Sequence, residues 1–148
     1  MTFYWDKIEI TALAASPPLV FDLINACSPL LKTETIDRFV NRFINSHNDG
    51  LFGVIKYKDY FWNKKGVLIT PWPKEYKYIN TKYVEETYKA AHVLYAGKMS
   101  LIKDDIWMGT YKKKDDPELF EMEEIECFDI DYQWQFDVAK ILYNNLKL

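Results

Sequence analysis

The side chains of this sequence that could perform catalysis or bind a transition metal are two histidines and two cysteines. His47 belongs to a His-Asn-Asp-Gly run, which is typical of a turn that ends a helix. His92 falls within a predicted helix and has no serine or cysteine nearby in the sequence to activate. Cys27 and Cys127 lack the spacings of zinc sites. We therefore predict no metal and no cofactor, with a mixed site of a cysteine and acids as the open alternative.

Neighbouring carboxylates are the other candidates for acid–base chemistry. They occur as Asp104-Asp105, Asp115-Asp116 and Glu123-Glu124. A glycosidase needs carboxylates that flank a cleft, and adjacent residues of a strand point to opposite faces, which argues against Glu123 and Glu124 acting together. The sequence has only five glycines and contains no nucleotide-binding, zinc-protease, redox or nucleophile-elbow motif. We expect no enzyme, although a hydrolase or transferase with an unfamiliar site around one of the histidines stays an alternative.

Acids and large aromatic residues alternate between residues 104 and 137. Residues 104–148 contain twelve acids and five lysines, a net charge of −7, whereas residues 1–103 have a net charge of +4. A negative surface with aromatic side chains suits a basic protein and repels nucleic-acid phosphates. The alternative interpretation is an ordinary solvated face. The predicted partner-binding residues are Trp107, Tyr111, Asp115, Asp116, Glu118, Glu121, Glu123 and Glu124.

A second segment, residues 56–65, combines four lysines with Tyr57, Tyr60, Phe61 and Trp62. Aromatic rings and positive charge together suit single-stranded nucleic acid, because bases stack on the rings and phosphates attract the lysines. The segment lacks the pattern of RNA-recognition motifs, and lysines also protect edge hairpins from aggregation. We favour the lysine-protected hairpin and keep an RNA- or single-strand-binding module as the alternative.

Length and composition predict one domain over residues 1–148. The hydrophobic content of 49% argues against disorder, and the aromatic content of 17% exceeds the need of one core, so some rings should lie at a binding surface. No signal peptide is expected, since residues 1–6 lack a basic and then apolar leader. No membrane span is expected either, since no apolar run approaches about eighteen residues. The prediction is a cytoplasmic protein with two reduced, separate cysteines.

Hydrophobic periodicity predicts the elements of the first half. Residues 3–14 favour a strand in their first half. Ser16-Pro17-Pro18 predicts the start of a helix that ends at Ser28-Pro29. A second helix opens at Thr33 and ends at the turn over 47–50, because apolar residues recur at helical spacing between them.

The second half is predicted to begin with strands. The expected elements are a strand over 51–61, a hairpin connection at 63–66, a return strand over 67–70, a helix over 80–97, one or two strands over 100–111, a strand over 122–130 and a final helix from Asp129 or Asp131. That final helix is apolar over much of its surface and should be largely covered. The order indicates an α+β fold with about four helices around a mostly antiparallel sheet.

These features favour a small binding protein over an enzyme. The leading hypothesis is an inhibitor that neutralises a basic partner through the acidic, aromatic stretch, as immunity proteins and antitoxins that block nuclease toxins do as a class. The likeness is one of charge and size, and no motif matches a family. The expected partner is a basic protein such as a nuclease toxin, and neither nucleic acid nor a membrane is expected. The oligomeric state and the strand order do not follow from the sequence.

Overall fold

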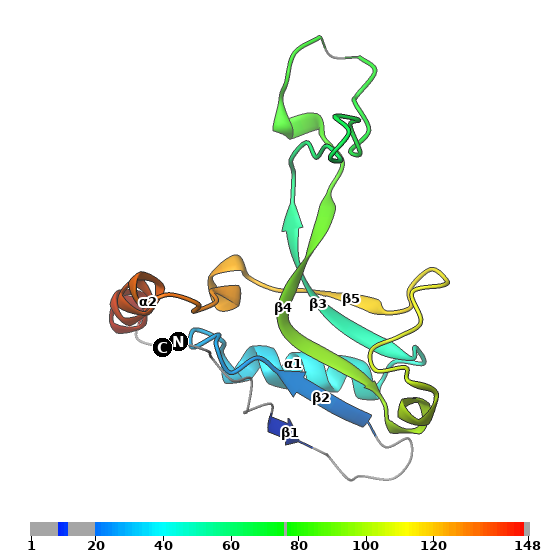
Figure 1. Ribbon diagram of the computed structural model, residues 1–148, viewed down its shortest axis with the longest axis vertical. Coiled ribbons are helices and arrows are strands. Elements are labelled where there is room, and N and C mark those ends of the chain that lie inside the picture. Colours follow the sequence, from blue (N-terminus) through cyan, green and yellow to red (C-terminus); the bar gives the residue numbers. More distant parts are fainter. Residues whose placement is uncertain (1–8, 12–19, 76, 147–148) are drawn as a thin grey trace.

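The computed structural model describes residues 9–11, 20–75 and 77–146. Five strands form one mixed sheet in the order β1-β2-β4-β3-β5. All neighbouring pairs are antiparallel except β3 and β5, which are parallel. The strands are β1 (Glu9–Thr11), β2 (Val20–Ile24), β3 (Gly50–Tyr57), β4 (Thr87–Lys98) and β5 (Glu118–Glu121). The predicted α+β class with a mostly antiparallel sheet is confirmed (Figure 1).

The described residues contain two α-helices and three short 3-10 helices, whereas the sequence predicts about four helices. They are α1 (Thr33–Ile44), α2 (Gln133–Leu146), η1 (Thr81–Tyr83), η2 (Met99–Asp104) and η3 (Glu124–Cys127). The predicted helix that opens at Thr33 is confirmed, and its end at residue 44 is followed by the expected turn. The predicted final helix is also confirmed, and it begins two residues after Asp131.

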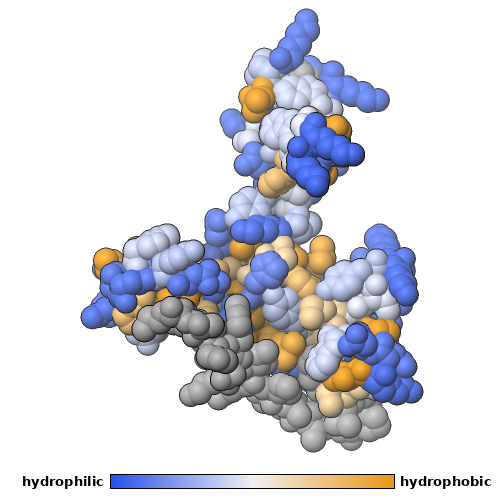
Figure 2. Space-filling view, viewed as in Figure 1, coloured by the Kyte–Doolittle hydropathy of each residue, from blue (hydrophilic) through white to orange (hydrophobic). Residues whose placement is uncertain are grey.

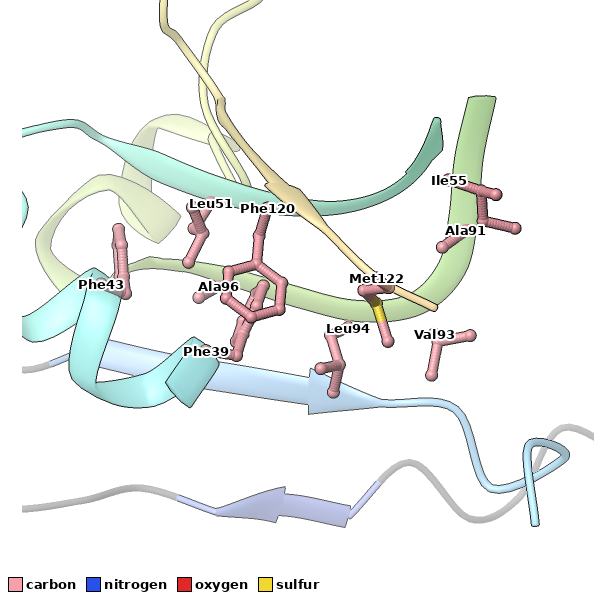
Figure 3. Close-up of a cluster of buried hydrophobic side chains, with 10 residues drawn as sticks. All are labelled: Phe39, Phe43, Leu51, Ile55, Ala91, Val93, Leu94, Ala96, Phe120 and Met122. Carbon is pink, nitrogen blue, oxygen red and sulfur yellow. The ribbon is translucent and has the colours of Figure 1, made fainter. Parts of the chain in front are cut away.

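The core lies between α1 and the sheet. Phe39 and Phe43 of α1 are buried against Leu51 of β3 and Phe120 of β5 (Figure 3). The Phe39 and Phe120 rings meet edge to face, with centroids 5.1 Å apart and an interplanar angle of 86°. This arrangement follows from the i, i+4 spacing of the two phenylalanines, which puts both rings on one face of the helix. The core therefore fixes α1 beneath β3 and β5.

Two predicted helices are wrong within the described residues. The segment 80–97 forms η1 and then the long strand β4, and the segment around residues 20–24 forms β2. β4 lies between β2 and β3 and bonds to both, so its backbone groups are satisfied by neighbours far away in the sequence. Strand preference depends strongly on such tertiary context, which a helical spacing of apolar residues does not reveal. The predicted start at Ser16-Pro17-Pro18 lies outside the described residues.

Three predicted strands and the covering of the last helix also need correction. Residues 99–104 form η2 where a strand was predicted, and residues 124–127 form η3. Residues 67–70 make a single bridge, Trp62 to Leu68, and no strand. In α2 only Ala139 is buried, and the Trp134 side chain is 61% exposed. The strand predicted in the first half of residues 3–14 lies outside the described residues, and β1 belongs to the second half of that segment.

Candidate functional site

Residues 56–89, here called the arm, project from the rest of the described chain (Figure 1). At its base the ends of β3 and β4 continue as an antiparallel pair, with Lys56 opposite Tyr88 and Tyr57 opposite Thr87. Beyond this pair the arm is built from turns and η1. The predicted hairpin segment 56–65 is therefore the first third of a larger projecting element.

A small cluster of its own orders the arm. Tyr60, Thr70 and Val84 are buried there. The Phe61 amide donates to the Thr70 hydroxyl at 3.1 Å, and the Ile69 amide donates to the Phe61 carbonyl at 2.7 Å. These contacts hold the two sides of the arm together without the main core.

The predicted turn at residues 63–66 is confirmed. The Asn63 side-chain oxygen accepts from the amides of Lys65 at 2.9 Å and Val67 at 3.1 Å. Gly66 has a φ of 77°, which a residue with a side chain rarely adopts. The turn places Lys64 and Lys65 side by side at an exposed bend.

Aromatic rings cover much of the arm. Tyr60 is their buried base, with its ring centroid 5.2 Å from that of Trp72 at 32° and 6.4 Å from that of Trp62. Trp62 is 53% exposed and Tyr78 is 65% exposed. The other exposed rings of the arm are Phe61, Trp72, Tyr83 and Tyr88. Because Trp62 and Trp72 pack against the buried Tyr60 ring, their indole rings are held in place while they remain exposed to solvent.

The arm is also basic. It carries eight lysines and four acids. Lys58 pairs with Glu86 of the arm at 3.6 Å, and Lys56 pairs with Glu121 of β5 at 3.0 Å. The exposed lysines of the arm that form no ion pair with a described residue are Lys64, Lys65, Lys74, Lys77, Lys82 and Lys89. Figure 2 shows hydrophilic and apolar side chains alternating on the visible face of the arm.

The acidic residues predicted to bind a partner are largely engaged within the chain. Asp116 is 2% exposed and accepts from the Thr110 amide at 3.1 Å and from the Thr110 hydroxyl. Glu118 accepts from Ser46 at 2.9 Å and Asn48 at 3.0 Å and pairs with Arg42. Burial opposes ionisation of Glu118, but the hydrogen bonds from Asn48, Arg42 and Ser46 outweigh it and lower its pKa.

Two further acids of that prediction bind the base of the arm. Glu121 pairs with Lys56, and the Tyr57 hydroxyl donates to Glu124 at 2.9 Å. These contacts raise the pKa of Lys56, through its hydrogen bond to Glu121, and the pKa of Tyr57, through its hydrogen bond to Glu124. Both acids therefore anchor the arm to the region around β5. Of the predicted acids, Asp115 and Glu123 remain exposed, and their carboxylates form no hydrogen bond or ion pair to a described residue.

The two predicted aromatic residues line a hollow of about 360 Å³ formed by residues 105–112. The Trp107 indole donates to Asp105 at 3.0 Å, and the exposed Tyr111 ring lies 6.4 Å from that of Phe52. Asp115 precedes β5 in the same loop, whereas Glu123 and Glu124 follow the other end of β5. Trp107 and Tyr111 thus share one hollow, and Glu123 and Glu124 belong to a different part of the chain.

The histidines and cysteines occupy separate places. His92 lies in β4 rather than in a helix, and at φ 57° it marks the register shift between β3 and β4. Its Nδ1 is 2.9 Å from the Tyr95 hydroxyl.

Cys27 and Cys127 are both free thiols, as predicted. Burial is the main cause that raises the pKa of each thiol, and it raises that of Cys127 to about 11. In the described part of the chain, no three His, Cys, Asp or Glu side chains are grouped as metal ligands.

No protein-family model and no curated protein matches this sequence, so the site is judged on its geometry. Neither α-helix of the described residues has the length and hydropathy that crossing a membrane requires. The arm is larger than the basic, aromatic segment 56–65 that the sequence predicts. Its signal is the recurrence of lysine beside tyrosine at residues 77–78, 82–83 and 88–89, which continues the pattern of residues 56–65.

Proposed function

We propose that the protein binds single-stranded nucleic acid along its arm. The observation that carries this proposal is that exposed aromatic rings and unpaired lysines share one projecting element. Proteins that bind single strands combine these two features, because every base has a face to stack and every nucleotide has a phosphate. Such binding tolerates many sequences. It excludes an intact duplex, whose bases already stack on each other.

The acidic remainder of the chain does not prevent this binding. Outside the arm the net charge is −7, since the arm carries +4 and the whole chain −3. Charges in solvent at physiological salt are screened beyond about 8 Å, so a strand held on a projecting arm is little affected by acids on the rest of the chain. The acids nearest the arm, Glu121 and Glu124, are already engaged with Lys56 and Tyr57.

Fluorescence anisotropy of a labelled oligothymidylate tests the proposal. Trp62→Ala removes an exposed ring and should weaken binding about tenfold, the effect of losing one stacked base. Lys64→Gln with Lys65→Gln should weaken binding and lower its salt dependence, because fewer counterions are released. Trp134→Ala in α2 and Lys103→Gln in η2 are the matched controls, as both residues are exposed and outside the arm. Equal losses of oligothymidylate affinity in the control variants would refute the arm as the binding site.

A second candidate function is an inhibitor of a basic protein, and one observation favours it. Trp107 and Tyr111 are exposed beside the hollow of residues 105–112, with the exposed carboxylate of Asp115 in the same loop. Aromatic residues are typical anchors of protein interfaces, and a charged rim speeds association.

A pull-down from a host lysate with salt elution separates the two functions. Recovery of nucleic acid in an amount that Trp62→Ala reduces supports binding by the arm. Recovery of one basic protein that the paired change Trp107→Ala and Asp115→Lys abolishes supports the inhibitor instead.

A further inference from the structure

The outer edge of β5 is open in the described part of the chain, where β5 is the last strand of the sheet. The Met122 amide donates to the Val54 carbonyl at 2.8 Å, so residue 122 faces β3. Backbone groups of successive strand residues alternate between the two sides of the strand. Phe120 and Glu118 therefore also face β3, and Leu119 and Glu121 present their N–H and C=O groups to the outer edge. Unpaired groups of this kind are a template for another strand.

A polar hollow of about 550 Å³ lies between this edge and α1. Its lining residues are Arg38, Asn41, Arg42, Asn45, Ser46 and Glu118. Glu118 neutralises Arg42, whereas Arg38 lies over the Phe120 ring, 5.7 Å from its centroid, and pairs with no carboxylate of the described chain. The hollow is therefore positive overall and rich in side-chain amides.

We infer that the edge of β5 binds an extended peptide by strand addition, with acidic side chains over α1 and apolar side chains beside Leu119. Side chains of a strand alternate between the two faces of the sheet. Glu118 and Phe120 point toward α1, where they contact Arg42 and Phe39, so Leu119 points to the other face, where it is 47% exposed. An added strand follows the same alternation, which places every second side chain over the hollow.

A second copy of the chain is a poorer occupant of this edge. Antiparallel pairing of two β5 strands about a two-fold axis keeps both α1 helices on the same face of the joined sheet, so the positive hollow of one copy lies on the same side as that of the other. Like charges brought together in this way oppose association. The charges of the hollow thus select a foreign, acidic segment. This inference does not depend on the function of the arm.

An NMR titration with a defined peptide tests it. The probe is an acetylated and amidated seven-residue peptide in which Val and Glu alternate between Thr ends. Its addition to the ¹⁵N-labelled protein should shift the signals of Leu119, Glu121 and Arg38 and slow amide exchange at the first two. The same peptide with N-methyl groups on its edge-facing amides should not bind, because it lacks the donors. The absence of any shift at about 1 mM peptide overturns the inference, since that concentration detects even weak binding.

Two variants separate the backbone from the side-chain contribution. Leu119→Pro removes an N–H that β3 does not use, and proline is tolerated at the open side of an edge strand. It should abolish binding, whereas Leu119→Val should preserve it. Asn41→Asp should weaken binding of the Glu peptide about tenfold and strengthen binding of a Lys counterpart, because it removes the net positive charge of the hollow. Full binding of the peptide by the Leu119→Pro variant would show that the peptide does not bind by strand addition. Shifts of the Leu119 signal with protein concentration alone would show that the edge binds a second copy of the chain instead.

Discussion

Asp22 and Glu118 are two carboxyl groups whose surroundings shift their ionisation in opposite directions. Asp22 lies in β2 opposite Ala96 of the core, its Oδ1 has no hydrogen-bond partner in the described structure, and burial raises its pKa from 3.8 to about 6. Glu118 keeps its charge, because hydrogen bonds from Asn48, Arg42 and Ser46 outweigh the effect of burial and lower its pKa. An ionised carboxylate thus destabilises the folded state at Asp22 and stabilises it at Glu118.

Asp22→Asn should stabilise the protein at neutral pH. The folded state binds the Asp22 proton more tightly than the unfolded chain, so the contribution of this group is complete below about pH 4 and is lost as the pH rises through about 6. We expect a gain in the free energy of unfolding at pH 7.5 and little change at pH 4, where Asp22 is protonated in the folded state. The gain should be about 1 kcal/mol, because solvent screens part of the Asp22 charge. Urea unfolding at both pH values measures this. Asp37→Asn in α1 is the exposed control, and a gain that does not depend on pH contradicts the account.

Glu118→Gln should show the opposite dependence on pH. Its lowered pKa means that the charged group stabilises the folded state above the unfolded pKa, and that this stabilisation is lost as the pH falls. We expect a loss of about 1 kcal/mol at pH 7 that disappears in acid, since one charge-assisted network is weakened. The same unfolding measurement checks it, with Glu123→Gln as the exposed control. Equal stability of Glu118→Gln and the parent protein at pH 7 would show that the contacts of Glu118 do not stabilise the folded state.

At the scale of elements, the arm and α2 both expose rings, but for different structural reasons. The arm is ordered by its own buried residues Tyr60, Thr70 and Val84, while the core of α1 and the sheet lies elsewhere. Helix α2 buries only Ala139 among its described side chains. Both elements therefore contribute little to the main core.

Replacing residues 59–85 by Asn-Gly should leave the rest of the protein folded. Lys58 and Glu86 already face each other at 3.6 Å after the last pair of β3 and β4, which is the geometry that a two-residue hairpin turn connects. The ¹H–¹⁵N signals of α1, β2 and β5 should keep their positions. Collapse of that spectrum would show that the arm is part of the folding core.

Trp134→Ala in α2 should lower the free energy of unfolding by less than about 0.5 kcal/mol, as for other exposed positions. Phe39→Ala in α1 should lower it by about 3–5 kcal/mol, because it opens a cavity against Phe120. Denaturant unfolding of the two variants makes the comparison directly. Similar losses for both variants would mean that α2 packs more deeply than its exposure indicates.

At the scale of the whole molecule, the linear charge asymmetry does not become two charged faces. The acids of residues 115–124 are divided between a loop, the contacts of β5 and the base of the arm, and the lysines gather on the arm. Folding therefore weakens the acidic surface predicted from the sequence and strengthens the basic, aromatic alternative.

The sequence predicted what local patterns decide and missed what distant pairing decides. α1, β3, α2 and the turn at Asn63 follow from periodicity and capping, and all are present. β4 was mistaken for a helix because its partners, β2 and β3, are distant in sequence. The burial of Asp116 could not be read from an Asp-Asp-Pro run, since it depends on the fold of the loop around Thr110.

The most direct test of the central claim compares the full chain with the Asn-Gly replacement of residues 59–85 in binding a labelled oligothymidylate at low and at physiological salt. The account predicts that the full chain binds, that its affinity falls as salt rises, and that the shortened protein, still folded, does not bind at either salt concentration. Binding of the shortened protein with the affinity of the full chain, or no binding by the full chain at low salt, would contradict it.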